Sequence, residues 1–155
     1  MSSKLYEDND FTDLCAGEDK IAVHKNFLVA HSDVFKAMLS GPWKEAAEGK
    51  VNVEGVTIKV LERLKNYMYN GDVFYTDDEE LRTLLLLARY YLIEDLQKQC
   101  IRLLAETVKP ETLFSHIEFA CQHQIPELPF AMLQMTQDSV VNEAFSIRRR
   151  AEYEV

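Results

Sequence analysis

The chain has 155 residues, of which 47% are hydrophobic and 28% are charged, values typical of one globular domain or of one domain with a small appendage. The formal net charge of −9 gives a polyanionic ligand a repulsive average field, which argues against nucleic-acid binding. The longest apolar run, residues 84–88, is too short to span a bilayer, and the polar start of the chain lacks a signal-peptide core. We therefore expect a cytoplasmic or nuclear protein that binds neither nucleic acid nor membrane.

The three cysteines are Cys15, Cys100 and Cys121, and they form no CxxC pair. An odd number at wide spacing argues against a disulfide framework and against a structural zinc site. We expect free, buried thiols in a reducing compartment, and no metal or cofactor.

The first third of the chain is predicted to hold a hairpin and two helices. Residues 1–9 are expected to form a flexible tail. Residues 14–16 and 21–23 predict two short strands around the turn residues 17–20. Apolar residues at helical spacing predict helix over 25–39, which Ser32 divides into two short helices by capping the second.

The remainder is predicted to be mostly helical. Residues 43–49 are expected to form a polar loop, residues 51–53 a strand, and residues 73–75 a brief extended piece. Five helices are expected at 57–70, 79–91, 93–107, 111–122 and 130–140. This order of elements indicates an α+β fold that is dominated by helix.

The side chains that could carry chemistry do not form a recognisable site. Cys15 with His24, and Cys121 with His116, are conceivable nucleophile and base pairs, but no local motif positions either pair. The acidic residues 77–80 and the basic residues 148–150 are read as helix ends, where such charges complement the helix dipole. We expect a protein that is not an enzyme, and an enzyme with an unfamiliar site remains the alternative.

Several segments, in order and at suitable spacing, resemble a BTB/POZ domain. They are Phe11-Thr12-Asp13-Leu14, Val23-His24-Lys25-x-x-Leu28, the segment 32–39, Val51-x-Val53, Leu64-x-x-Tyr67-Met68-Tyr69-x-Gly71, Leu84-x-x-x-Ala88-x-x-Tyr91 and Leu96-x-x-x-Cys100. The resemblance implies a BTB/POZ fold over residues 10–106, with a small mixed sheet flanked by helical hairpins. Residues 107–155 look like the start of a BACK-type helical extension, here a C-terminal helix pair.

Two features depart from the family's pattern. The segment between Asp13 and His24 is about two residues shorter than the family leads us to expect, and the region before Asp10 is also short. A dimer made by exchanging an N-terminal strand is therefore not expected. Asp13, His24 and Ser32 are assigned to stabilising the fold, because each falls where a strand or helix ends and backbone groups need partners.

The resemblance implies a protein–protein interaction adaptor that links a substrate protein, whose identity is unknown, to a cullin scaffold of a ubiquitin ligase. Trp43-Lys44-Glu45 looks like the hydrophobic-x-Glu element that such adaptors present to the cullin, and the helices after Pro110 look like the element that widens that contact. Met38 and Tyr69 complete the candidate cullin interface, and either one is also a candidate to pack against Trp43 if that ring faces its own domain.

A homodimer is expected through residues 24–39. Phe27 and Leu28 are adjacent and about 100° apart on a helix, so one of them is expected to cover a neighbouring subunit. Phe27, Leu28, His31 and Phe35 are the candidate dimer residues. The alternatives are self-association or corepressor recruitment in transcription, and a tetrameric scaffold.

Overall fold

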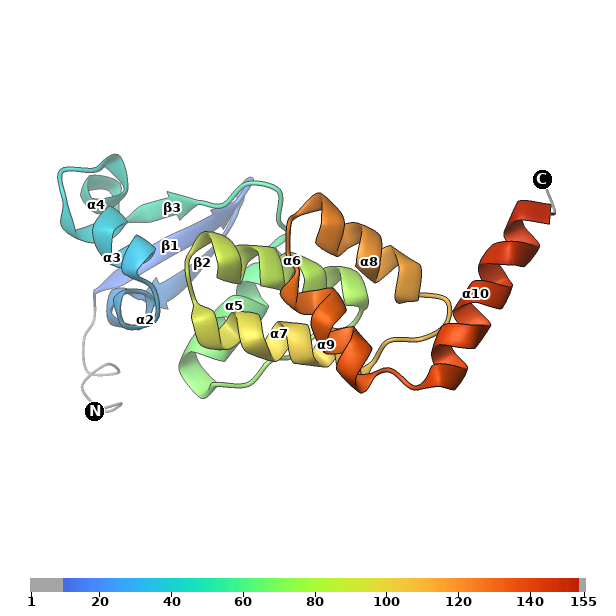
Figure 1. Cartoon of the computed structure of the whole chain (residues 1–155). Helices are drawn as coiled ribbons and strands as arrows, with labels where there is room; N and C mark the ends of the chain where they lie inside the picture. The colour runs from blue at the N-terminus through green and yellow to red at the C-terminus, as the bar shows by residue number, and fades with distance from the viewer. Residues whose placement is uncertain (1–9, 154–155) are drawn as a thin grey trace. The chain divides into compact units, whose positions relative to one another are not determined.

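The computed structural model describes residues 10–153, and Figure 1 shows the arrangement of their helices and strands. They divide into two compact units, and the boundary falls between Gln97 and Lys98, within helix α7 (Glu94–Glu106). The tail expected over residues 1–9 lies outside the described residues.

The first unit contains a mixed sheet in the order β2-β1-β3 (Figure 1). β1 (Phe11–Ala16) runs antiparallel to β2 (Asp19–His24) and parallel to β3 (Lys50–Asn52). Gly17 takes a φ of 63° in the tight turn between β1 and β2, a conformation that glycine adopts without steric cost. The α+β prediction with a small mixed sheet is confirmed. β1 begins three residues earlier than expected, β2 is longer at both ends, and β3 is shifted by one residue.

Helices α2 (Lys25–His31) and α3 (Asp33–Ser40) meet at the buried Ser32. The Ser32 hydroxyl accepts a hydrogen bond from the backbone N–H of Phe35 at 3.1 Å and donates one to the carbonyl of Tyr91 at 2.6 Å. The predicted division of this segment by a capping serine is confirmed. The same hydroxyl also ties α3 to the residue that follows α6.

A short helix, α4 (Lys44–Glu48), replaces the polar loop expected over residues 43–49, so that prediction was wrong. The segment has good helix-forming residues but no apolar periodicity, which is why its pattern resembles a loop. Gly49 ends the helix at a φ of 65° and donates its N–H to the carbonyl of Glu45 at 2.9 Å.

Helices α5 (Ile58–Asn70) and α6 (Asp78–Tyr90) form an adjacent pair. Arg63 on α5 pairs with Glu80 on α6 at 3.0 Å, and the Asp77 carboxylate caps α6 by accepting the N–H of Glu80 at 2.8 Å. Residues 73–75 belong to no helix or strand, and the brief extended piece expected there stays a prediction.

The second unit holds three helices after α7: α8 (Leu113–Gln122), α9 (Glu127–Met135) and α10 (Asp138–Tyr153). The single helix expected over 130–140, and with it the helix pair, was wrong. Thr136 takes an extended conformation, and its N–H caps α9 at the carbonyl of Met132. Pro129 fits inside α9 because it lies in the first turn, where its missing N–H is not needed.

The core of the first unit is formed by apolar side chains from all of its layers. Leu14, Leu28 and Leu61 have no exposed surface, and Phe35 stacks on Tyr91 with ring centroids 4.1 Å apart. All three cysteines are free thiols, but Cys121 on α8 is exposed, which contradicts the expectation that each is buried. Within residues 10–153 no helix has the length and apolar character to cross a membrane.

Candidate functional site

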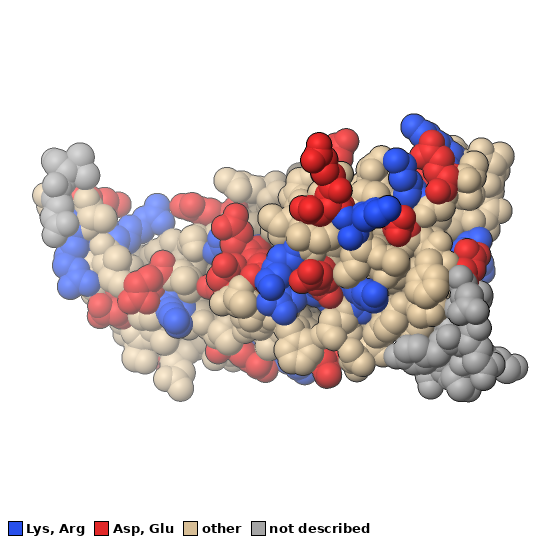
Figure 2. Space-filling model, turned by 180° about the vertical axis from the view of Figure 1, so that it is seen from behind, with Lys and Arg blue, Asp and Glu red and all other residues tan. Residues whose placement is uncertain are grey.

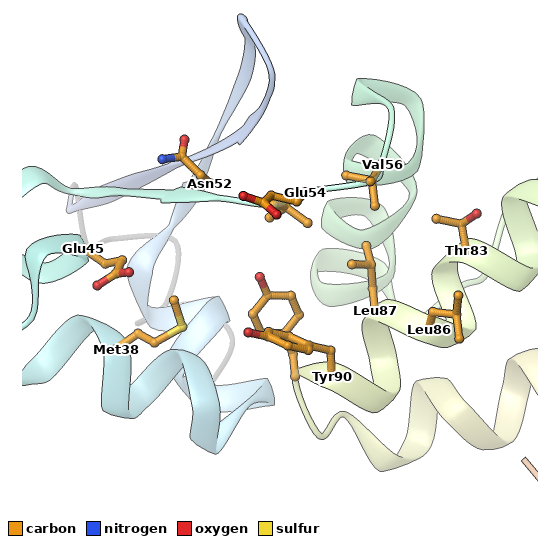
Figure 3. Close-up of a pocket in the computed structure, with 12 residues that line it drawn as sticks. Met38, Glu45, Asn52, Glu54, Val56, Thr83, Leu86, Leu87 and Tyr90 are labelled. Carbon is orange, nitrogen blue, oxygen red and sulfur yellow. The ribbon is translucent and has the colours of Figure 1, made fainter. Parts of the chain in front are cut away.

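An open pocket of about 650 Å³ lies in the first unit, and we call it the main pocket. As Figure 3 shows, α3 and α4 bound one side, α6 bounds the other, and the chain after β3 crosses above. Its lining includes Met38, Glu45, Glu54, Leu86, Leu87 and Tyr90. Its size is in the range of clefts that take a side chain or a small ligand.

Tyr91 forms part of the main pocket's lining and is itself buried. Burial, followed by the nearby charges of Tyr90 and Glu45, raises the pKa of Tyr91 to about 12. The phenol is therefore neutral at physiological pH. Because Tyr91 also stacks on Phe35, the α3 helix and the residues that follow α6 are held together beneath the pocket.

A second hollow of about 460 Å³, which we call the side pocket, adjoins the main pocket. Met38 and Glu45 line both hollows, so the two are neighbours, and we refer to them together as the groove. Val34, Trp43 and Leu92 supply the apolar lining of the side pocket. The side pocket is therefore mostly apolar, whereas the main pocket mixes apolar and polar side chains.

Trp43 lies at the start of α4, and 58% of its surface is exposed. Its backbone carbonyl accepts hydrogen bonds from the N–H groups of Ala46 and Ala47, which fixes its main chain. The indole lies in the side pocket with Met38, one of the two packing partners considered from the sequence. An indole with more than half of its surface in solvent remains available to a partner.

Two exposed residues of the groove were not singled out by sequence reasoning. Tyr90 ends α6 with 71% of its surface exposed, and Leu92 follows with 60% exposed. Leu92 has a φ of 55°, in the left-handed region that residues other than glycine seldom adopt. A leucine carries no sequence signal for this conformation, although its position between two helices could have flagged the turn.

Three carboxylates border the groove, those of Asp33, Glu45 and Glu54. None of them forms an ion pair with a Lys or Arg within residues 10–153. In Figure 3 the side chains of Glu45 and Glu54 lie on the pocket side of their segments, with Met38 between Glu45 and Tyr90. The groove thus offers apolar surface next to negative charge that no Lys or Arg of residues 10–153 neutralises.

Lys44 and Tyr69, two further candidates for the cullin interface from the sequence, do not line the groove. The Lys44 side chain is exposed and pairs with Glu48 at 3.8 Å along α4. Tyr69 is not among the residues that line either pocket. Its hydroxyl accepts the backbone N–H of His24 at 2.9 Å and its ring stacks on Phe27 at 4.1 Å. The structure therefore groups Met38, Trp43 and Glu45, and places Tyr69 in a separate aromatic cluster.

The argument that Phe27 and Leu28 cannot both face the interior was wrong. Both are buried, with 3% and 0% of their surface exposed, because α2 packs against α3, α5 and β2 together. Phe35 is also fully buried, and half-buried His31 bonds through Nε2 to the carbonyl of Met68 at 3.0 Å. Phe27, Leu28 and Phe35 serve the unit's own core, so the homodimer loses its sequence argument and stays a prediction.

Comparison with known proteins places this arrangement in a family. The family model for the BTB/POZ domain matches residues 3–108, more than half of the chain. The chain belongs to the BTB/POZ family. The match includes the sheet, helices α2 to α7 and the whole groove, while α8 to α10 lie beyond it.

The relatives of this BTB/POZ chain come from plants and animals. It is 28% identical over 138 residues to BTB/POZ domain-containing protein At4g08455 of Arabidopsis thaliana, covering 89% of this chain and 55% of the relative. It is 30% identical over 118 residues to Kelch-like protein 38 of Danio rerio, covering 75% and 20%. It is 31% identical to BTB and MATH domain-containing protein 42 of Caenorhabditis elegans, covering 67% and 26%. The chain thus spans about half, or less, of these relatives' length.

Solved structures show the same fold. The BTB domain of human Gigaxonin aligns with a TM-score of 0.50 and 24% identity, covering 64% of this chain and 80% of that domain's chain. The BTB domain of zebrafish PATZ1 aligns with a TM-score of 0.51 and 18% identity, covering 62% and 75%. At these identities the likeness supports the fold and not a function.

Proposed function

We propose that this BTB/POZ chain is a non-enzymatic adaptor whose groove docks a cullin-type scaffold of a ubiquitin ligase. One observation carries the proposal: Trp43 and Leu92 expose large apolar surface in a groove that also holds unpaired carboxylates. Exposed aromatic and aliphatic side chains at a concave surface are typical anchors of protein interfaces. The order Trp43-Lys44-Glu45 places the hydrophobic-x-Glu element at this groove, with its first and third residues lining it.

The charges of the groove favour a partner segment that combines apolar and basic side chains. Glu45, Glu54 and the exposed Tyr90 line the same pocket, so an Arg or Lys that enters it meets negative charge and an aromatic side chain. The chain as a whole carries 26 acidic and 17 basic residues. Figure 2 shows both kinds interspersed over one face. Such a balance speeds encounter with a basic partner and lowers affinity for nucleic acid.

The second unit and the substrate complete the proposal. Helices α8 to α10 form the helical extension that we propose widens the cullin contact, in the manner of the start of a BACK-type segment. A substrate protein of unknown identity would be recruited by this chain or by a partner of it. We place the complex in the cytoplasm or the nucleus.

The test of the proposal is the affinity of a cullin N-terminal domain for the wild-type chain and two variants. Trp43→Ala should weaken binding by about 2 kcal/mol or more, because a desolvated indole is a typical hot spot. Glu45→Lys should lower the association rate and reduce its salt dependence, because a rim charge acts on encounter. The matched control is Phe74→Ala, which removes a ring that is 50% exposed and lies outside the groove.

The melting temperature of each variant is measured on the same sample. Unchanged cullin affinity for Trp43→Ala, or equal losses for Trp43→Ala and Phe74→Ala, would contradict docking at the groove. Failure of the wild-type chain to bind any cullin would favour the other role that we keep open, self-association or corepressor binding.

Self-association is the second property that we propose, in the form of a homodimer. Light scattering at tens of micromolar should give a mass near twice the 17.9 kDa of one chain. A mass near that of one chain would rule the homodimer out at that concentration, and a mass near four chains would favour the tetrameric scaffold.

A further inference from the structure

Gly41 and Trp43 approach each other more closely than any larger residue at position 41 would allow. A methyl group placed on the Gly41 Cα would lie 2.8 Å from Cδ1 and 2.9 Å from Nε1 of the indole. It would lie 3.6 Å from the carbonyl oxygen of Ala37, which is an ordinary contact. The indole therefore rests with its Cδ1–Nε1 edge on the backbone of Gly41.

The backbone of Gly41 does not itself require glycine. Its φ of −115° and ψ of −166° are extended, a conformation open to every residue and favoured before a proline such as Pro42. Glycine is therefore needed at position 41 to leave space for the Trp43 ring, and not for the backbone conformation of the turn. By contrast, Gly49 has a φ of 65°, so glycine is favoured there by the backbone conformation itself.

We propose that Gly41 is a positioning residue, which sets the indole of Trp43 in the orientation that the docked partner meets. With no side chain at position 41, the ring folds back onto the chain at the edge of the side pocket, and Trp43 as a whole keeps 58% of its surface exposed. An anchor that is already oriented loses less conformational entropy on binding. This inference rests on the proposed function and names the residue that prepares the groove for it.

The predicted effect of Gly41→Ala is a moved ring on an intact fold. The added methyl group collides only with the exposed side chain of Trp43, which can rotate away at little cost to stability. Because Trp43 is the only tryptophan, indole fluorescence reports its position directly. We expect stronger quenching by acrylamide and an emission maximum shifted to longer wavelength in Gly41→Ala, with an unchanged melting temperature.

Cullin binding is then measured in a double-mutant cycle of Gly41→Ala and Trp43→Ala. Gly41→Ala alone should weaken binding about threefold to tenfold, the scale of immobilising one further side chain. In the Trp43→Ala background the same substitution should have no effect, because the ring that it displaces is gone. A purely structural role of Gly41 would instead lower affinity in both backgrounds and lower the melting temperature.

The outcomes separate this inference from the proposed function. If Trp43→Ala leaves binding unchanged, docking at the groove is wrong, and the fluorescence of Gly41→Ala still shows whether Gly41 sets the ring. If Trp43→Ala weakens binding but Gly41→Ala changes neither affinity nor quenching, docking stands and the positioning role of Gly41 is overturned.

Discussion

Leu92 combines an unfavourable backbone conformation with an exposed apolar side chain. A left-handed conformation costs residues other than glycine roughly 1–2 kcal/mol. Two backbone hydrogen bonds hold the turn. The N–H of Leu92 donates to the carbonyl of Arg89 at 3.3 Å, and the N–H of Ile93 donates to the carbonyl of Ala88 at 2.8 Å. Strained residues at a concave surface are often there for function, which agrees with the place of Leu92 in the groove.

Replacing Leu92 by glycine should therefore separate stability from binding. Leu92→Gly relieves the backbone strain and removes little buried surface, so the melting temperature should stay level or rise. The cullin affinity should fall by about 1 kcal/mol through the loss of apolar contact. Leu92→Asn, which also tolerates the left-handed region, is the matched control and should bind as weakly as Leu92→Gly.

Thermal unfolding and titration with the cullin domain check this prediction. A melting temperature lowered by several degrees in both variants would show that Leu92 belongs to the fold. Full affinity in both would remove it from the docking surface.

At the scale of single residues, part of the site could be predicted. Trp43 and Glu45 stand out because a lone tryptophan beside a proline and a charged stretch is costly to leave exposed without a partner. Glu54 and Leu92 do not stand out, since they reach the groove only through the path of the chain after β3 and after α6. The contacts of Tyr69 with His24 and Phe27 could not be predicted, because both residues are more than forty positions away in the chain.

At the scale of secondary-structure elements, Gly71 determines where helix α5 ends. It has a φ of 78° and donates its N–H to the carbonyl of Tyr67 at 2.7 Å. A methyl group there would meet no atom within 4 Å, so any cost of substitution comes from the backbone alone. Gly71→Ala should destabilise the protein by about 1 kcal/mol.

Gly71→Asn is the control for that prediction, since asparagine tolerates the left-handed region better than alanine. Urea unfolding should rank the wild type above Gly71→Asn and Gly71→Ala last. Equal stability of Gly71→Ala and the wild type would mean that the end of α5 can rearrange without cost.

Elements were predictable where local chemistry decides them. Ser32 and Gly71 mark helix ends by capping and by conformation, and both predictions are confirmed. The helix α4 was missed because five residues are too few to show an apolar stripe. The break at Thr136 was missed because the apolar residues on its two sides continue a helical pattern across it, and threonine has no strong tendency to end a helix.

At the scale of the whole molecule, the division into two compact units predicts that helices α8 to α10 contribute separately to cullin binding. Removing residues 110–155 deletes α8 to α10 and leaves the segment matched by the BTB/POZ family nearly complete. The truncated chain should unfold cooperatively and keep its helical circular dichroism in proportion to its length. Its cullin affinity should be about tenfold weaker, because the proposed contact is narrower.

Calorimetry and cullin titration of the truncated chain test this. Loss of a cooperative transition would show that the first unit depends on the second for its stability. Undiminished affinity would restrict the docking surface to the first unit.

The family and the α+β class were accessible from the sequence because several spaced motifs had to agree at once. The division of the chain was not, since the boundary falls inside α7 and no proline, glycine or polar linker marks it. The burial of both Phe27 and Leu28 could not be predicted from the sequence either. A helix that is enclosed on several sides buries residues that lie on different faces of it.

The strand order β2-β1-β3 has a consequence for how other chains can attach. Among the described residues β2 pairs only with β1 and is therefore an edge strand of the sheet, but its outer side is partly covered by α5, where the Tyr69 hydroxyl accepts the N–H of His24 at 2.9 Å. Lys65 already occupies one acceptor there, donating from Nζ to the carbonyl of Ala22 at 2.7 Å. The groove takes its sheet residues from β3 and the segment after it, on the opposite side of β1. A partner docked at the groove would therefore leave the β2 edge and its hydrogen bonds to α5 undisturbed.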